Sequence, residues 1–238
     1  MTEYNQIVKS ITEFINQYTE MNIKAVVMHC PYWINRLKDG KVTLRGFANG
    51  KGEANEIREE LERRLDYLPP NLKFNLTDEA IRKFARREKI GIDCSGFVYR
   101  VIDELLQLGY GDTKYKKLDE IFTGGINKTN VERLTSDEYS RRVSDMRNYK
   151  IGDVIRLWGG KHAAIIINNN KKEILYAHSS WLSTKIQGVH TSRIQIIDEG
   201  KTLEEQRWME ETRKGENFGQ KYFNSEKGDG VFRLKIFN

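Results

Sequence analysis

Three residues of this chain could act together in acyl-transfer chemistry: a cysteine, Cys94, and two histidines, His162 and His178. Cys94 follows Asp93 and begins an apolar helical pattern, so we expect it at a helix N-terminus, where backbone N–H groups and the helix dipole favour an anion. That position favours the reactive thiolate, and the same N–H groups could stabilise an oxyanion. The alternative for Cys94 alone is a small buried apolar residue, which is common for cysteine.

The two histidines fall on neighbouring predicted strands. His162 starts one strand and His178 ends the next, and the turn between them, 168–172, is centred midway between the two residues. A symmetric hairpin would place the imidazoles directly opposite each other on one face of the sheet. We interpret His162 as a general base and His178 as the group that orients it. Two structural histidines, or a metal site for which no third ligand is evident, are the alternatives.

The motifs around these residues resemble those of the NlpC-type cysteine peptidases, which are papain-like bacterial hydrolases that act mostly on cell-wall peptides. The matching segments are DCSGFV (93–98), GDVI (152–155), HAAIIIN (162–168) and YAHSS (176–180), followed by Gly188-Val189. The resemblance covers about residues 93–189. It implies that Cys94 is the nucleophile, His162 the general base and His178 the third catalytic residue. The separation of 68 positions between Cys94 and His162 is long for the family and indicates an elaborated connector.

The resemblance also implies substrate-binding roles for three further residues. Asp93 and Ser95 flank Cys94, and in related enzymes such residues help to recognise a substrate amino terminus. Pro31-Tyr32 resembles the PY turn of the family, whose tyrosine lies at the active site, but about sixty residues separate it from Cys94 here. The alternatives are a helix N-cap for Asp93, a first-turn residue for Ser95 and a core aromatic for Tyr32.

The elements that must position these residues change type along the chain. Helical periodicity predicts helices over about 2–18, 53–68 and 94–108 and one from about 78, and capping-box spacing predicts a short helix over 135–146. Runs of Val, Ile and aromatic residues predict strands over 154–158, 162–168, 173–179, 193–197 and 231–236, with a charged helix at about 203–213. Helices followed by strands indicate an α+β fold, in which the nucleophile helix packs on an antiparallel sheet of about five strands. The resemblance implies a papain-like arrangement.

We expect a helical N-terminal region, residues 1–90, packed on a catalytic core, residues 91–238, that contains an elaborated connector at 110–150. Loops around a rigid scaffold usually carry recognition, so the connector and the N-terminal region are expected to determine specificity. His190 lies outside the strand register of the other two histidines and is expected at the surface.

The composition restricts the partners of the protein. The chain has 238 residues and a net charge of +6, but its 40 Lys and Arg residues are mixed with 34 Asp and Glu residues. No basic run dominates and no apolar stretch approaches transmembrane length, so we expect neither nucleic-acid binding nor a membrane span. Two cysteines and no recognisable export signal predict reduced thiols and a cytoplasmic protein as encoded, with delivery to a cell wall by another route.

These features predict a cysteine hydrolase that cleaves an amide through a thioester, without a metal or organic cofactor. The expected partner is a peptide or muropeptide substrate, and the choice of a cell-wall stem peptide follows from the resemblance alone. Two alternatives are an amidase or acyltransferase of the same superfamily that acts on another amide or ester, and a non-catalytic binding module. The sequence makes no prediction of oligomeric state.

Overall fold

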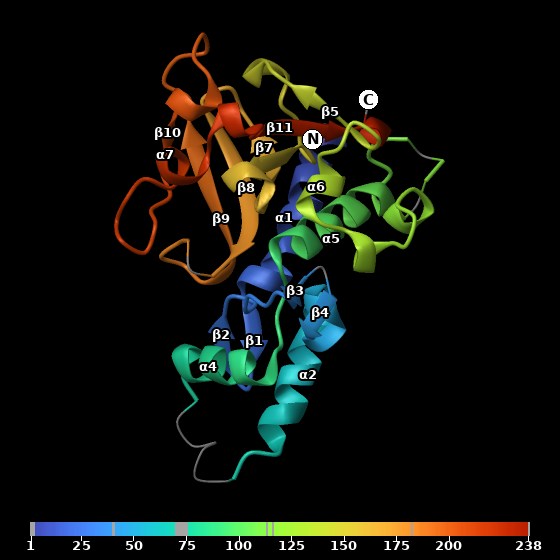
Figure 1. Cartoon of the computed structure of the whole chain (residues 1–238), viewed down its shortest axis with the longest axis vertical. Coiled ribbons are helices and arrows are strands. Elements are labelled where there is room, and N and C mark those ends of the chain that lie inside the picture. The colour runs from blue at the N-terminus through green and yellow to red at the C-terminus, as the bar shows by residue number, and fades with distance from the viewer. Residues whose placement is uncertain are drawn as a thin grey trace.

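The computed structural model describes residues 3–39, 41–69, 76–112, 114–115, 117–181 and 183–237. A large antiparallel sheet, with helices α1 (Glu3–Thr19) and α5 (Cys94–Gln107) against it, occupies one end of the molecule (Figure 1). Helices α2 (Ala54–Asp66) and α4 (Asp78–Glu88) lie at the other end. The chain therefore combines helices with an antiparallel sheet, as the α+β prediction states.

The main sheet has seven strands in the order β10-β9-β8-β7-β6-β11-β5, not about five. The strands are β5 (Ser140–Val143), β6 (Val154–Leu157), β7 (His162–Asn169), β8 (Glu173–Ser180), β9 (Gly188–Gln195), β10 (Arg207–Trp208) and β11 (Gly230–Leu234). The two additional strands, β5 and β10, lie where the sequence predicts helices over 135–146 and 203–213. Strand pairing outweighs the local helical signals in both segments: Val143 pairs with Val231, and Trp208 pairs with Ile194.

Both faces of this sheet are covered. On one face, residues of β7 such as Ile165 join a core with Phe97 of α5 and Ile11 of α1. On the other face, Ile166 packs in a second core that includes Trp208 and is completed by the short helix α7 (Phe218–Tyr222). Burial on both faces explains why β7 is a continuous apolar run rather than an alternating one.

The helices predicted over 2–18, 53–68 and 94–108 and from about 78 form as expected, although Thr2 lies outside the described residues. Thr77 caps α4 by accepting a hydrogen bond of 3.2 Å from the Ala80 N–H, and Asp93 caps α5 by accepting one of 2.6 Å from the Gly96 N–H. Gly109 follows the end of α5 with a φ of +78°, the left-handed conformation that favours glycine after a helix. Among the described residues, no helix is both long and apolar enough to cross a lipid bilayer.

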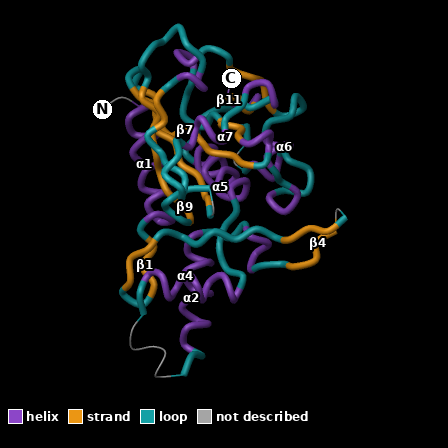
Figure 2. The backbone as a smooth tube through the Cα atoms, turned by 60° about the vertical axis from the view of Figure 1, so that its left-hand side comes forward, coloured by secondary structure: helices purple, strands orange, loops and turns teal. Residues whose placement is uncertain are grey.

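The N-terminal region is not wholly helical. It contains two hairpins, β1 (Met21–Ile23) with β2 (Val26–Met28) and β3 (Arg36–Lys38) with β4 (Lys41–Leu44). The second hairpin projects from the body of the molecule (Figure 2). Its strands are largely exposed, so this hairpin adds little to the core. A short helix, α6 (Val131–Leu134), lies in the connector.

Candidate active site

Cys94 is the first residue of α5 and is almost completely buried, with 3% of its surface exposed. Burial, together with the Asp93 carboxylate, raises the pKa of the Cys94 thiol to about 12, although backbone N–H groups of Ala163 and Ser95 act in the opposite direction. The expectation of a stabilised thiolate is therefore not met, because desolvation of the charge outweighs the helix terminus. Cys94 needs a base to become a nucleophile.

His162 and His178 are brought together as the sequence predicts, with 2.7 Å between Nε2 of His162 and Nδ1 of His178. They are not directly opposite, however. Ile165 pairs with Ala177 and Ile166 with Tyr176, and the register shifts before Asn168. Continuing this register towards the start of β7 makes the two histidines diagonal neighbours on one face. The pairing of Asn169 with Ile174 centres the turn between Lys171 and Lys172 rather than on Asn170, and the bulge shifts the register back by only one residue.

The hydrogen bonds around His178 determine which nitrogen of His162 is basic. Nε2 of His178 lies 3.0 Å from Oε1 of Glu210, so Nε2 carries the proton and donates it to the carboxylate. Nδ1 of His178 then accepts a hydrogen bond from Nε2–H of His162. Nδ1 of His162 is left without a proton and is the free base. Burial lowers the pKa of His162 well below its usual value, so the ring stays neutral at neutral pH.

Two residues of this cluster were missed by sequence reasoning. His190, expected at the surface, is 2% exposed and pairs directly with His178 across β8 and β9. The loop between β8 and β9 is centred midway between His178 and His190, so the spacing used for His162 and His178 would also have predicted this pairing. Glu210 follows β10 in a charged segment that carries no recognisable signal. Burial tends to raise the pKa of Glu210, but the two histidines outweigh burial and hold that pKa far below its usual value.

Asp93 and Ser95 lie together beside Cys94, but an internal lysine already occupies the position between them. Nζ of Lys51 lies 3.1 Å from both carboxylate oxygens of Asp93 and 2.9 Å from Oγ of Ser95. All three side chains are buried. An ammonium group is thus bound by the residues that the resemblance assigns to a substrate ammonium, and it comes from this chain.

Replacing Lys51 with methionine is expected to lower the free energy of unfolding by about 3–5 kcal/mol, because the Asp93 carboxylate would remain buried without its cation. The matched control is Lys9→Met. Lys9 pairs with Glu13 at the surface, where both side chains are more than half exposed, and the change should cost less than about 0.5 kcal/mol. Urea denaturation of both variants measures the free energy of unfolding. Equal losses in the two variants would contradict a large contribution of the buried ion pair to stability.

Tyr32 reaches the site despite its distance in sequence. The N–H of Ile92 donates to the carbonyl of Pro31 at 2.9 Å, and Tyr32 forms a parallel bridge with Ile92, one residue before Asp93. Burial, with Cys94 and Asp93 close enough to add to it, raises the pKa of the Tyr32 hydroxyl. Tyr32 is only partly buried and lies outside the main core, in contrast to its neighbour Trp33. Tyr32 thus lies beside the start of α5, and its role in substrate binding stays a prediction.

If the Tyr32 hydroxyl contacts the substrate, Tyr32→Phe should lower kcat by about tenfold to a thousandfold and leave the melting temperature near that of the parent protein. Only one hydroxyl group is removed, and the ring keeps its packing. Steady-state kinetics and thermal denaturation of the same sample provide both values. Unchanged kinetics would assign Tyr32 a purely structural role.

A cavity of about 460 Å³ adjoins Asp93 and Ser95. Its walls come from the N-terminal region on one side and from the connector on the other. The residues that line it are Ile34, Asn35, Leu37, Val42, Arg45, Asn49, Lys51, Asp93, Ser95, Asn127, Lys128, Thr129 and Asn130. The expectation that these two regions determine specificity stays a prediction, for which this cavity is the candidate binding site.

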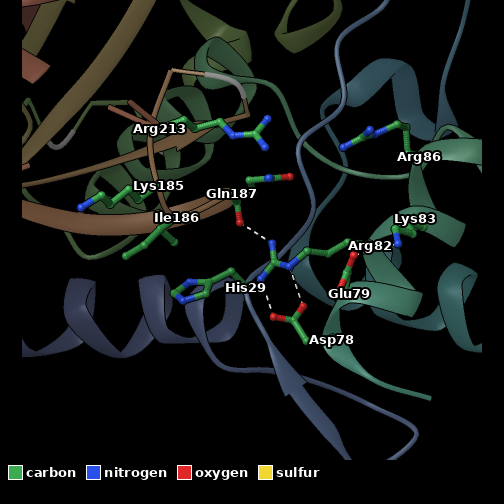
Figure 3. Close-up of a pocket in the computed structure, with 10 residues that line it drawn as sticks. All are labelled: His29, Asp78, Glu79, Arg82, Lys83, Arg86, Lys185, Ile186, Gln187 and Arg213. Atoms are coloured by element: carbon green, nitrogen blue, oxygen red, sulfur yellow. Dashed lines mark hydrogen bonds and ion pairs between the residues drawn. The ribbon is translucent and has the colours of Figure 1, made fainter. Parts of the chain in front are cut away.

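A second cavity, of about 560 Å³, lies between α4 and the segment that precedes β9 (Figure 3). Arg82 crosses it, pairing with Asp78 and donating to the carbonyl of Gln187.

Gly188, the residue after Gln187, has a φ of +96°, and a Cβ there would lie 2.2 Å from the Cys30 carbonyl oxygen. Glycine is required at this point because β9, which carries His190, must approach the N-terminal segment closely.

No family model, curated protein or solved structure matches this chain.

Proposed function

We propose that the protein is a papain-like cysteine hydrolase that cleaves an amide bond through a thioester on Cys94, with a peptidoglycan stem peptide as substrate. The observation that carries this proposal is the buried series of hydrogen bonds from His162 through His178 to Glu210. It leaves His162 as a neutral base, next in sequence to Ala163, whose backbone N–H is close enough to the Cys94 thiol to act against the rise in its pKa. A structural pair of histidines would not need a thiol at this place.

In the proposed reaction the Cys94 thiol attacks the amide carbonyl while its proton passes to Nδ1 of His162. Backbone N–H groups at the start of α5 stabilise the oxyanion that forms on the carbonyl oxygen. The C–N bond then breaks, the His162 proton passes to the leaving amine, and a thioester remains on Cys94. Water attacks the thioester, again with His162 as base, and releases the carboxylic acid and the free thiol.

We assign substrate recognition to the cavity beside Asp93 rather than to Asp93 and Ser95 themselves. Those two side chains already accept hydrogen bonds from Lys51. Arg45 and Lys128 contribute positive charge to its walls, and Leu37 and Val42 contribute apolar surface. Such a cavity suits a peptide that carries both carboxylates and aliphatic side chains, which supports a stem peptide. For a cytoplasmic protein, recycled wall fragments would be the accessible form of that substrate.

Incubation with purified peptidoglycan and free muropeptides, followed by mass spectrometry, tests the proposal. Hydrolysis should yield two fragments whose masses sum to that of the substrate plus one water, and the Cys94→Ala protein should yield none. A product that carries a second amine or alcohol in place of water would instead indicate an acyltransferase. Absence of products together with no labelling of Cys94 by a thiol-directed acylating probe would indicate a binding module.

A further inference from the structure

Three side chains converge behind the candidate active site. Nε2 of His178, Nε2 of His190 and Oε1 of Glu210 form a nearly equilateral triangle with sides of 3.0, 3.0 and 2.9 Å. All three residues are buried. Within the part of the chain that the structure describes, this is the one group of His, Cys, Asp and Glu side chains whose ligand atoms converge closely enough for a metal ion.

When His190 is neutral, the triangle has too few hydrogen atoms to satisfy its own polar atoms, and either a second proton on His190 or a bound cation supplies the missing positive charge beside Glu210. Nδ1 of His190 lies 3.0 Å from the carbonyl oxygen of Gly188, so a neutral His190 carries its proton there and presents a lone pair at Nε2. The Glu210 carboxylate also presents only lone pairs, and it faces that nitrogen at 2.9 Å. Nε2–H of His178 is left as the single donor for both. Lone pairs that are buried together in this way favour a cation between them.

We propose that His178, His190 and Glu210 form a binding site for a divalent transition-metal ion of the zinc class. Two histidines and one glutamate are an established ligand set for zinc, with a fourth position left for water. Ligands about 2.1 Å from a tetrahedral ion lie about 3.4 Å apart, so each side of the triangle needs to lengthen by about 0.4–0.5 Å. Small movements of side-chain torsions provide that change.

The surroundings of the three ligands are those that a metal site needs. The Gly188 carbonyl orients His190 through Nδ1, and the Tyr176 hydroxyl donates to Oε2 of Glu210, which leaves Oε1 for the ion. Hydrogen bonds of this kind fix the orientation of metal ligands. An approach for the ion exists as well, because a cavity of about 310 Å³ includes His190 and Glu210 in its wall.

A metal ion in the site would change which nitrogen of His162 carries the proton. The importance of that change rests on the proposed function, in which His162 is the base. A metal ion on Nε2 of His178 requires a lone pair there, so the proton of His178 moves to Nδ1 and is donated to Nε2 of His162. The neutral His162 ring must then carry its own proton on Nδ1, the nitrogen assigned as the base. The bound ion would therefore switch off the candidate catalytic pair without contacting Cys94.

Titration of the full-length Cys94→Ala protein with Zn²⁺ in a calorimeter tests the site, since this variant removes the thiol as a competing ligand. We expect a single ion per chain. Glu210→Gln, which keeps a hydrogen-bond acceptor for His178, and His190→Asn, which keeps a donor near the position of Nδ1, should each weaken binding at least about 100-fold. His29→Ala removes a histidine outside the triangle and should leave the affinity unchanged.

A second measurement keeps the proposal testable if those variants fold poorly. The chain has four histidines, so long-range ¹H–¹⁵N spectra of the ¹⁵N-histidine-labelled Cys94→Ala protein can report each ring nitrogen. Addition of Zn²⁺ should shift Nε2 of His178 and His190 and move the proton of His162 from Nε2 to Nδ1. No binding at millimolar Zn²⁺, equal binding by the ligand variants, or coordination by His29 or by His162 would overturn the site. None of these outcomes depends on hydrolysis, so a failure of the proposed function would be seen separately.

Discussion

Replacing Cys94 with alanine is expected to abolish amide hydrolysis. The expected decrease in kcat is about a thousandfold to ten-thousandfold. In the proposed reaction Cys94 supplies the sulfur that forms the thioester. The side chain is small and sits at the first position of α5, so its truncation should leave the helix intact. Product formation from muropeptides, measured by mass spectrometry, gives the rate, and circular dichroism verifies the fold.

Cys30→Ala is the matched control, because Cys30 is also a buried free thiol. Its sulfur makes only a long contact of 3.8 Å with the Pro31 carbonyl and lies in the apolar core. The control should lose about 1 kcal/mol of stability through a small cavity and keep its turnover. Activity that survives Cys94→Ala, or that disappears equally in Cys30→Ala, would rule out a nucleophilic role for Cys94.

Loss of His162 is expected to reduce kcat by about a hundredfold to ten-thousandfold, and loss of His178 by a smaller factor. In the proposed reaction His162 accepts the thiol proton, which the thiol cannot lose unaided because burial and Asp93 raise its pKa. The proposed role of His178 is only to hold the tautomer and orientation of His162 through the 2.7 Å hydrogen bond. Steady-state kinetics of His162→Ala and His178→Ala give the order of the two effects.

A conservative variant separates positioning from packing at residue 178. His178→Asn keeps an acceptor near the place of Nδ1 and should recover part of the activity that His178→Ala loses. Added imidazole should partly restore His162→Ala and have no effect on His178→Ala, because only the first variant lacks a base. A larger loss in His178→Ala than in His162→Ala would mean that the two roles are exchanged.

The elements that carry the candidate site could largely be predicted from local sequence patterns. Interactions within one helix, α5, determine three of these positions: the N-cap Asp93, Cys94 in the first turn and Gly109 after the last turn. The strands that carry His162 and His178 follow from apolar runs and a short turn. These features depend on residues close in the chain, and for that reason spacing alone identifies them.

The tertiary structure alone decided the remaining features. Glu210 and Lys51 enter the site from segments 32 and 42 positions away from their partners His178 and Asp93, and no local pattern encodes such distant contacts. Edge strands β5 and β10 depend on pairing with β11 and β9, which overrides local helical signals. The pKa of Cys94 rises because the folded chain removes water from the sulfur. A helix N-terminus can be recognised in sequence, but desolvation depends on everything packed around it.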